Sequence, residues 1–209
     1  MCGITGIFSP SYNIINIGTQ VNQMSERIKH RGPDGEGLWI DESNTIALGH
    51  RRLAIIDLSQ DGAQPMSSSC GRYTMVFNGE IYNYLEIRSQ LEKKGNSFRG
   101  RSDSEVLISA IATWGLIKAL DSALGMFAIA LWDKKVKPLS LVRDRAGKKP
   151  LYYCLSNKSL YFSSEIKSFK NLEGVSLSVS HEAISHYLSL SFIPSPLTIY
   201  NEIQEVVPG

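Results

Sequence analysis

Long apolar runs and paired cysteines are both missing from this sequence. No stretch of its 209 residues approaches the ~20 apolar residues of a membrane-spanning helix, and the N-terminus lacks the basic and apolar segments of a secretory signal. The three cysteines, at positions 2, 70 and 154, have neither the number nor the spacing of a disulfide framework or a zinc knuckle. The sequence therefore predicts a cytoplasmic protein with no membrane partner.

An excess of charge of one sign is also missing. Net charge is +2, and the basic residues are scattered apart from the pairs Arg51-Arg52 and Lys148-Lys149. This pattern excludes the basic surface of a nucleic-acid partner and favours a small-molecule substrate. The histidines, at positions 30, 50, 181 and 186, do not have the spacing of metal ligands, so we expect no metal and only satisfied or exposed histidines.

Nucleotide-binding glycine patterns are missing as well. The stretch RGPDGEG, from Arg31, does not have the glycine order of a dinucleotide-binding loop. Gly147-Lys148-Lys149 has no glycine five positions earlier and no Ser or Thr after the lysine, as a P-loop requires. We therefore expect no nucleotide cofactor in this chain.

What is present is the composition of an ordinary globular domain. Hydrophobic residues make up 43% of the chain and charged residues 20%, and the length suffices to bury a core without disulfides. We expect one domain over residues 1–209. The stretch IPSP from Ile193 and the final Pro208-Gly209 are typical of a connection, so the last ~20 residues are expected to approach a junction with a further domain.

Hydrophobic periodicity predicts an α+β fold. Apolar and β-branched runs predict strands at 2–8, 37–40, 46–48, 53–56, 73–77, 127–132, 139–142, 151–155 and 160–163. Apolar residues spaced three and four apart predict helices at 19–29, 82–94, 103–113 and 181–190. Strands come in runs with helices between the runs, which favours antiparallel sheets packed with helices over a doubly wound parallel sheet.

The second residue, Cys2, is the first candidate for chemistry. Removal of Met1 would place a thiol of pKa ~8.5 and an α-amine of pKa ~7.7 on one residue, so that the nucleophile carries its own general base. In an arbitrary protein, a cysteine at this position is more often a small hydrophobe that begins a strand. Whether Cys2 is a nucleophile or a small hydrophobic residue therefore depends on what the rest of the sequence contains.

Attack on an amide also needs donors for the oxyanion. Asn78-Gly79 follows a predicted strand, where a sharp turn would expose the Asn78 amide and the Gly79 N–H, and a glycine lets a substrate approach closely. The alternative is an ordinary Asn-Gly hairpin turn, which this dipeptide signals strongly by itself.

Charged residues suited to an amino-acid substrate lie nearby in the sequence. An arginine beside a strand end, at Arg51 or Arg52, suits bidentate capture of an α-carboxylate, and we expect the other of the pair to be a surface arginine. Asp103 could accept from an ammonium group or cap its own helix, and Glu80 could be only a solvated turn residue.

Taken in order, these segments resemble the N-terminal glutaminase domain of the class II, or N-terminal-nucleophile, glutamine amidotransferases, in particular the asparagine synthetase type. The matching stretches are CGITGIF from Cys2, RGPDGEG from Arg31, HRRLAIIDLS from His50, GAQPM from Gly62, FNGEIYNY from Phe77, RSDSEVL from Arg101, GMFAIALWD from Gly125, RDRAGKKPLYY from Arg143 and SSEIKS from Ser163. The likeness covers the chain essentially from end to end.

The resemblance implies a four-layer αββα sandwich of two mostly antiparallel sheets, and it implies a role for each candidate. Cys2 would attack the side-chain amide of glutamine, its α-amine would carry the proton, and Asn78 with the Gly79 N–H would hold the oxyanion. Arg52 would bind the glutamine α-carboxylate, and Glu80 and Asp103 its ammonium. The backbone of three further residues would line the pocket: Leu53, Ile55 and Ile56.

The resemblance also implies a partner that this sequence does not contain. In the family, ammonia passes to a C-terminal synthetase domain that uses ATP and Mg, and its Ser-Gly-Gly-x-Asp-Ser loop is absent here. Aspartate is the first choice of acceptor, with a sugar acid or another carboxylate as alternatives, and a homodimer is left open. A non-catalytic glutamine-binding domain and a cysteine peptidase are the competing interpretations, and a form that retains Met1 is expected to be inactive.

Overall fold

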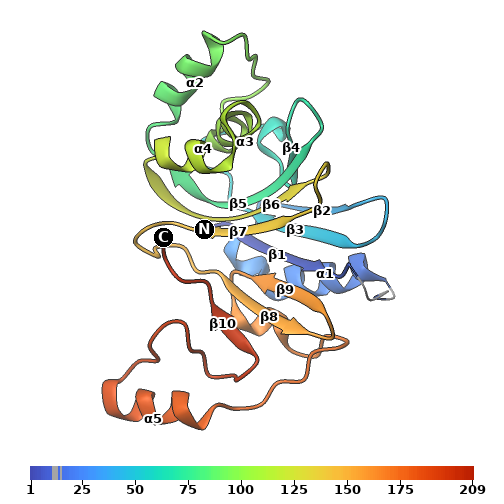
Figure 1. Cartoon of the computed structure of the whole chain (residues 1–209), viewed down its shortest axis with the longest axis vertical. Coiled ribbons are helices and arrows are strands. Elements are labelled where there is room, and N and C mark those ends of the chain that lie inside the picture. The colour runs from blue at the N-terminus through green and yellow to red at the C-terminus, as the bar shows by residue number, and fades with distance from the viewer. Residues whose placement is uncertain (11–13, 15) are drawn as a thin grey trace.

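Two antiparallel sheets lie face to face, and helices cover the outer face of each (Figure 1). The computed structural model describes residues 1–10, 14 and 16–209. The larger sheet has the strand order β10(Ile203–Glu205), β8(Tyr152–Ser156), β9(Ser159–Ser163), β1(Gly3–Phe8), β3(Ile46–Arg52) and β2(Gly35–Ile40). The smaller sheet has the order β4(Met66–Ser67), β5(Tyr73–Ile81), β6(Gly125–Asp133) and β7(Leu139–Arg143).

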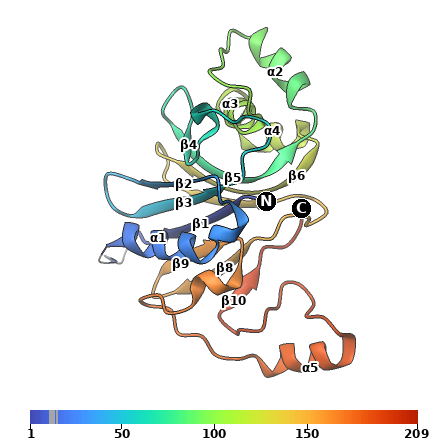
Figure 2. The ribbon, with the colours of Figure 1, turned by 180° about the vertical axis from the view of Figure 1, so that it is seen from behind.

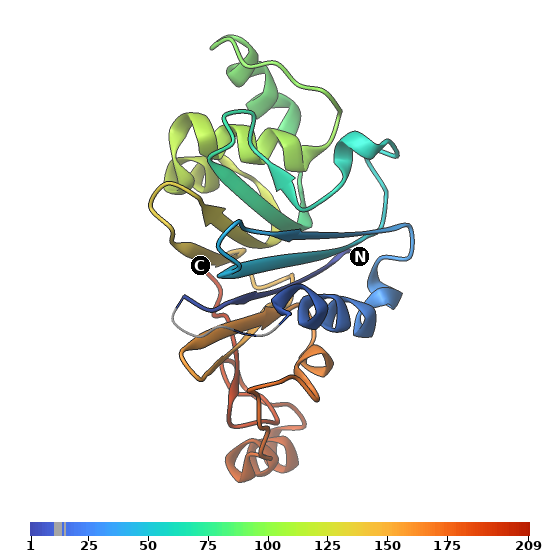
Figure 3. The ribbon, with the colours of Figure 1, turned by 90° about the vertical axis from the view of Figure 1, so that its right-hand side faces the viewer.

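The helices complete four layers. Helix α1(Ile17–Arg27) packs on β1 and β3, on the outer face of the larger sheet. On the outer face of the smaller sheet lie α2(Tyr84–Glu92), α3(Asp103–Trp114) and α4(Leu116–Ser122), as the view from behind also shows (Figure 2). Helix α5(His181–Leu190) lies away from both sheets in the side view (Figure 3). The predicted αββα sandwich is therefore confirmed.

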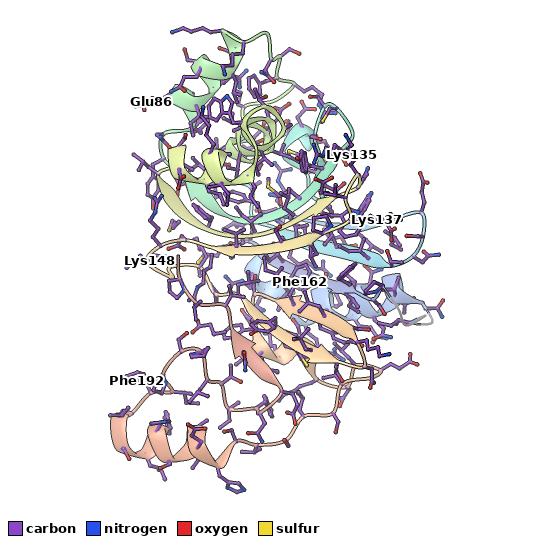
Figure 4. All side chains as sticks on the ribbon, in the orientation of Figure 1. Glu86, Lys135, Lys137, Lys148, Phe162 and Phe192 are labelled. Atoms are coloured by element: carbon purple, nitrogen blue, oxygen red, sulfur yellow. The ribbon has the colours of Figure 1, made fainter. Side chains whose placement is uncertain are left out.

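Among the described residues, three apolar cores fill the spaces between the layers. One core joins the smaller sheet to its helices and includes Phe77 and Ile111. A second joins the larger sheet to α1 and includes Ile7 and Met24. The third lies between the two sheets and contains Trp132 and Phe162, the latter labelled between the sheets in Figure 4.

Most predicted elements are confirmed, and some bounds are corrected. Residues 53–56 do not form the predicted strand, because β3 ends at Arg52 and the chain leaves the sheet there, with Ile55 71% exposed. The predicted turn at Asn78-Gly79 is also wrong. Strand β5 continues through both residues to Ile81, and they pair in register with Ala128 and Phe127 of β6. The short elements β4, α4 and β10 were not predicted.

The strand register brings the candidate site together. Strand β1 lies inside the larger sheet, between β3 and β9, and its first residue pairs with Arg51 near the end of antiparallel β3. Cys2, one residue before β1, therefore lies beside Arg52 and Leu53. Strand β5 of the facing sheet brings Asn78 to the same place. Among the described residues, no helix is long and apolar enough to cross a membrane.

Candidate active site

A cavity of about 250 Å³ opens where the two sheets meet beside the N-terminus. Every residue that the sequence analysis assigned to a site lines this cavity: Cys2, Arg52, Leu53, Ile55, Ile56, Asn78, Gly79, Glu80 and Asp103. Segments that are 100 residues apart in the chain thus meet around one space. Within the described part of the chain, no group of His, Cys, Asp or Glu side chains is arranged to hold a metal ion.

The thiol of Cys2 lies against the backbone of Leu53. The Leu53 N–H lies 3.4 Å from the sulfur, and the thiol lies 3.6 Å from the Leu53 carbonyl oxygen. The Cys2 carbonyl oxygen accepts a hydrogen bond of 2.9 Å from Arg31 Nε. Met1, which precedes it, is 58% exposed. Cys2, the nucleophile candidate, is therefore held by Leu53 and Arg31, and Met1 is accessible beside it.

Arg31 is itself fixed by residues that the sequence analysis did not assign. Its Nη1 forms a 3.0 Å ion pair with Glu165, which also contacts His30 at 2.8 Å and Lys167 at 3.2 Å. Burial opposes ionisation of Glu165, but the hydrogen bonds from these three partners prevail and hold its pKa below the usual range. Arg31 belongs to the stretch RGPDGEG, and Glu165 and Lys167 belong to the stretch SSEIKS. Both stretches are part of the family resemblance, and that membership was the sign in the sequence that these residues matter.

Asn78 is the most unusual polar side chain in the cavity wall. It is 1% exposed, and neither its Oδ1 nor its Nδ2 has a hydrogen-bond partner in the described structure. A buried amide without partners costs free energy, roughly 1–3 kcal/mol, so such groups are rare in folded proteins. Its two polar atoms are therefore available to a ligand in the cavity.

Gly79 offers a free backbone donor on the same strand. The N–H groups of Phe77 and Ile81 face away from β6 and donate to Gln64 Oε1 at 2.6 Å and to Asp103 Oδ2 at 2.9 Å. N–H groups alternate between the two edges of an antiparallel strand, so the Gly79 N–H between them faces the same way, with no acceptor among the described residues. A Cβ at position 79 would lie 2.4 Å from the Met126 carbonyl oxygen, so the strand pairing itself requires glycine.

The guanidinium of Arg52 is enclosed by the loop that follows β3. Its Nη1 donates to the Ser59 carbonyl oxygen at 2.7 Å, and its Nη2 donates to the carbonyl oxygen of Asp57. Gly62 allows this enclosure, because a Cβ there would lie 2.5 Å from Nη2. Arg52 forms no ion pair in the described structure, so its charge and its remaining N–H groups can receive a carboxylate.

Arg51 corrects one expectation. The other arginine of the pair was expected on the surface, but Arg51 is 6% exposed. Side chains alternate along a strand, so Arg51 faces the opposite side of the sheet from Arg52. There it forms ion pairs of 2.5 Å with Glu26 and with Glu36. Arg51 therefore joins α1 and β2 to β3 and takes no part in the cavity.

Two carboxylates, Glu80 and Asp103, line the cavity together with Arg52. Asp103 is 6% exposed, and burial raises its pKa above the ordinary value in spite of hydrogen bonds from the N–H groups of Ile81 and Ser104. It does not cap its helix, because Ser102 accepts from the Glu105 N–H instead. Glu80 is a half-buried residue of β5 and not a solvated turn residue.

His50 also departs from expectation. It is 1% exposed, and its Nε2 lies 3.2 Å from the Phe77 carbonyl oxygen of the facing sheet, while its Nδ1 has no hydrogen-bond partner among the residues that the structure describes. Burial lowers its pKa to about 4, so the ring is neutral at physiological pH. His50 and Arg52 are two residues apart, and side chains at this spacing lie on the same face of a strand. This spacing in the sequence could have indicated that His50 lies on the cavity side of β3.

Comparison with known protein families shows to which family the chain belongs. The sequence profile of the "Glutamine amidotransferase domain" family matches residues 1–209. The chain belongs to this family. It is a class II glutamine amidotransferase domain.

Asparagine synthetases are among the most similar curated relatives of this amidotransferase domain. The chain is 40% identical to asparagine synthetase [glutamine-hydrolyzing] 1 of Bacillus subtilis, over 100% of this chain and 33% of that protein. It is 36% identical to putative asparagine synthetase 2 of Methanocaldococcus jannaschii, over 96% of this chain and 41% of that protein. A differently named relative is amidase chry2 of Gibberella zeae, at 36% identity over 81% of this chain and 26% of that protein. The chain thus spans between about a quarter and two fifths of these relatives.

A solved structure agrees with the fold of the amidotransferase domain. Glutamine phosphoribosylpyrophosphate amidotransferase from B. subtilis superposes with a TM-score of 0.70, over 80% of this chain and 43% of that chain. Sequence identity is 21%, so this likeness bears on the fold alone.

Proposed function

We propose that this domain hydrolyses glutamine to glutamate and ammonia, with Cys2 as an N-terminal nucleophile. One observation carries the proposal: Asn78 is buried with both polar atoms unpartnered, in the same cavity as the Cys2 thiol. A site that keeps an amide unsatisfied in the free protein is suited to a charge that arises only during a reaction.

The proposed reaction begins after removal of Met1. The Cys2 thiol gives its proton to the freed α-amine, and the sulfur bonds to the side-chain carbonyl carbon of glutamine. Asn78 Nδ2 and the Gly79 N–H donate to the oxyanion of the tetrahedral intermediate. The C–N bond then breaks as the α-ammonium returns its proton to the leaving ammonia. Water hydrolyses the resulting thioester and releases glutamate.

Charge complementarity supports glutamine as the substrate. The unpaired guanidinium of Arg52 would bind the α-carboxylate, and Glu80 and Asp103 would receive the α-ammonium. Backbone groups of Leu53, Ile55 and Ile56 would enclose the rest of the molecule. An ammonium group beside Asp103 would favour its ionised form and offset the effect of burial on its pKa.

A direct assay tests this proposal. The natural protein with Met1 removed is incubated with glutamine, and glutamate is measured against a Cys2→Ala variant. We expect glutamate release that depends on Cys2, and its absence from a form that retains Met1, whose Cys2 nitrogen is an amide. Turnover equal to the Cys2→Ala control would rule out hydrolysis and leave a glutamine-binding domain, which retention of Met1 in the natural protein would favour.

We further propose that the ammonia serves a synthetase domain that uses ATP and Mg. This chain spans about a third of the length of the asparagine synthetase relatives, which supports a further domain in the natural protein. The names of these relatives support aspartate as the acceptor and asparagine as the product. One relative is named an amidase, so the alternative is that the acceptor is another carboxylate, such as a sugar acid. Supplying each acceptor with glutamine and ATP to the natural protein, and identifying the amide formed, distinguishes the two.

A further inference from the structure

His50 carries a buried hydrogen-bond acceptor to which the proposed reaction assigns no role. The ring lines the same cavity as the Cys2 thiol. Its Nε2 lies 3.2 Å from the Phe77 carbonyl oxygen, and a carbonyl oxygen only accepts, so Nε2 carries the proton of the neutral ring. Nδ1 then holds a lone pair, and no hydrogen-bond donor among the described residues reaches it.

The side chains of His50 and Asn78 both face the space between the two sheets. On β3, Ile46 and Leu48 belong to the core between the sheets, and His50 is the next residue on that face of the strand. On β5, Val76 belongs to the same core, and Asn78 is the next residue on that face. The two strands pack against each other from opposite sheets (Figure 1). Polar side chains therefore replace apolar ones where this core reaches the cavity.

Asn78 provides a second acceptor that is not yet used. Both polar atoms of its side chain are unpartnered among the described residues, and the proposed reaction uses only Nδ2. Its Oδ1 therefore remains, in addition to Nδ1 of His50. Buried acceptors without a donor cost free energy and are rare in folded proteins. Two of them in the wall of one cavity indicate a ligand that brings N–H or O–H donors.

The groups around these acceptors restrict the chemistry of that ligand. A carboxylate has no donor, and its lone pairs would face those of His50 and Asn78. An ammonium group has donors, but its charge favours the carboxylates of Glu80 and Asp103 in the same cavity, and the charge of Arg52 disfavours a cation at His50. A primary carboxamide fits, because it is uncharged and its nitrogen has two N–H donors.

We propose that His50 Nδ1 and Asn78 Oδ1 each accept one N–H group of the substrate carboxamide, and that these two acceptors make the site specific for an amide over an acid. This inference rests on the proposed function and deepens it. The Asn78 amide can pair with the substrate amide through two hydrogen bonds, one donated by its Nδ2 and one accepted by its Oδ1. The second N–H of the substrate then donates to His50. The product carboxylate has neither donor, so the same acceptors disfavour it and promote its release.

The first test compares ligands in a protein that does not turn them over. The Cys2→Ala variant of the natural protein, with Met1 removed, is titrated in a calorimeter with glutamine, with the γ-methyl ester of glutamate and with glutamate. The ester keeps the α-ammonium, the α-carboxylate and an uncharged side-chain carbonyl, but its side chain has no N–H. We expect glutamine to bind at least about 10-fold more tightly than the ester or glutamate, because both leave the two acceptors unsatisfied.

This comparison needs no substitution at His50. Equal affinity for glutamine and the ester would overturn the inference, and so would a failure of glutamine to bind. The α-ammonium is present in all three ligands, so a preference for glutamine over the ester reports the side-chain N–H groups alone.

Two substitutions separate the two nitrogens of His50. In His50→Gln the side-chain amide can still donate to the Phe77 carbonyl oxygen, but the acceptor at Nδ1 is lost. In His50→Asn the side-chain oxygen takes the place of Nδ1, and the contact with Phe77 is lost. We expect His50→Gln to reduce the preference for glutamine over the ester roughly 10-fold, whereas His50→Asn should keep most of the preference and have the lower Tm.

His186→Gln is the matched control, because His186 lies on α5, away from both sheets. It should leave the preference for glutamine and the Tm near the parent values. A preference in His50→Gln that equals that of His186→Gln would overturn the inference. An equal loss of preference in His50→Gln and His50→Asn would also overturn it, since the effect would then not depend on Nδ1.

Kinetics with Cys2 intact distinguish this inference from the proposed function. In His50→Gln the ratio of the glutamate inhibition constant to the glutamine KM should fall roughly 10-fold. If the parent hydrolyses glutamine and this ratio does not change, the inference fails and the proposed function stands. If binding of glutamine depends on His50 but the parent releases no glutamate, hydrolysis fails and the carboxamide site stands.

Discussion

Asn78 is a single buried residue on which the proposed hydrolysis depends. Replacement by alanine removes a donor to the oxyanion, so we expect Asn78→Ala to lower kcat by roughly 100-fold or more with little change in KM. Neither polar atom of the side chain has a partner in the described part of the chain, so the substitution breaks no hydrogen bond there. Steady-state kinetics and thermal unfolding together test this expectation.

Asn83 supplies the matched control. Its Nδ2 donates to the Ser122 carbonyl oxygen at 3.0 Å, and its Oδ1 accepts from the Leu124 N–H at 2.9 Å. Asn83→Ala should therefore lower Tm and leave kcat near the parent value. A reversed result, with Asn78→Ala unstable and fully active, would assign Asn78 a purely structural role.

Arg52 is expected to determine affinity for the substrate. Loss of a charge-assisted, bidentate contact of about 1.5–3 kcal/mol should raise the glutamine KM of Arg52→Ala by roughly 10- to 150-fold. Arg51→Ala, the comparison variant, breaks the ion pairs with Glu26 and Glu36, so it should affect stability and leave KM almost unchanged. An unchanged KM in Arg52→Ala would mean that another group binds the carboxylate.

Between elements, His50 joins β3 of one sheet to β5 of the other. The folded state holds its pKa near 4, against 6.5 in the unfolded chain, so between these pH values the unfolded chain binds a proton that the folded state does not. Stability should therefore rise with pH across this window, by about 3 kcal/mol in total from this residue. In His50→Gln, whose amide can still donate to Phe77, urea unfolding at several pH values should show a flatter slope.

At the level of strands and helices, periodicity identified most elements, because β1, β6 and α3 have clear apolar patterns. It was wrong for residues 53–56, whose apolar side chains line and flank the cavity instead of entering a sheet, with Ile55 71% exposed. The sequence signal for an Asn-Gly turn did not decide the structure at Asn78-Gly79, because both residues pair with β6, whose partner residues lie 48 and 50 positions away in the chain. Secondary-structure propensity describes the preference of a short segment, and it contains no information on contacts with distant parts of the chain.

The site was predictable as a set of residues but not as an arrangement. The resemblance assigned Cys2, Arg52 and Asn78, whereas the unpartnered state of Asn78 and the burial of Lys149, which is 6% exposed, follow from the three-dimensional packing. Lys148 and Lys149 are adjacent and identical in type, and only the fold distinguishes them.

For the whole molecule, packing between the sheets should control both stability and activity, because Cys2 and Asn78 lie on opposite sheets. Trp132 is 2% exposed in this core, with its ring 5.4 Å from that of Phe8. Trp132→Ala should lower the free energy of unfolding by about 3–5 kcal/mol and reduce glutaminase activity. Phe192→Ala, at a residue 58% exposed, should change stability by less than about 0.5 kcal/mol. Urea unfolding and the glutamate assay measure both effects.

The inner place of β1 has a consequence for biosynthesis. The ribosome makes β1 before either of its neighbours, and one of these, β9, ends only at Ser163. A nascent chain that has not yet been synthesised as far as Ser163 cannot pair β1 with β9, so the cavity beside Cys2 is incomplete. We expect prematurely terminated translation products to carry the Cys2 thiol without the cavity around it, so that the proposed hydrolysis of glutamine cannot begin before β9 has been synthesised and paired.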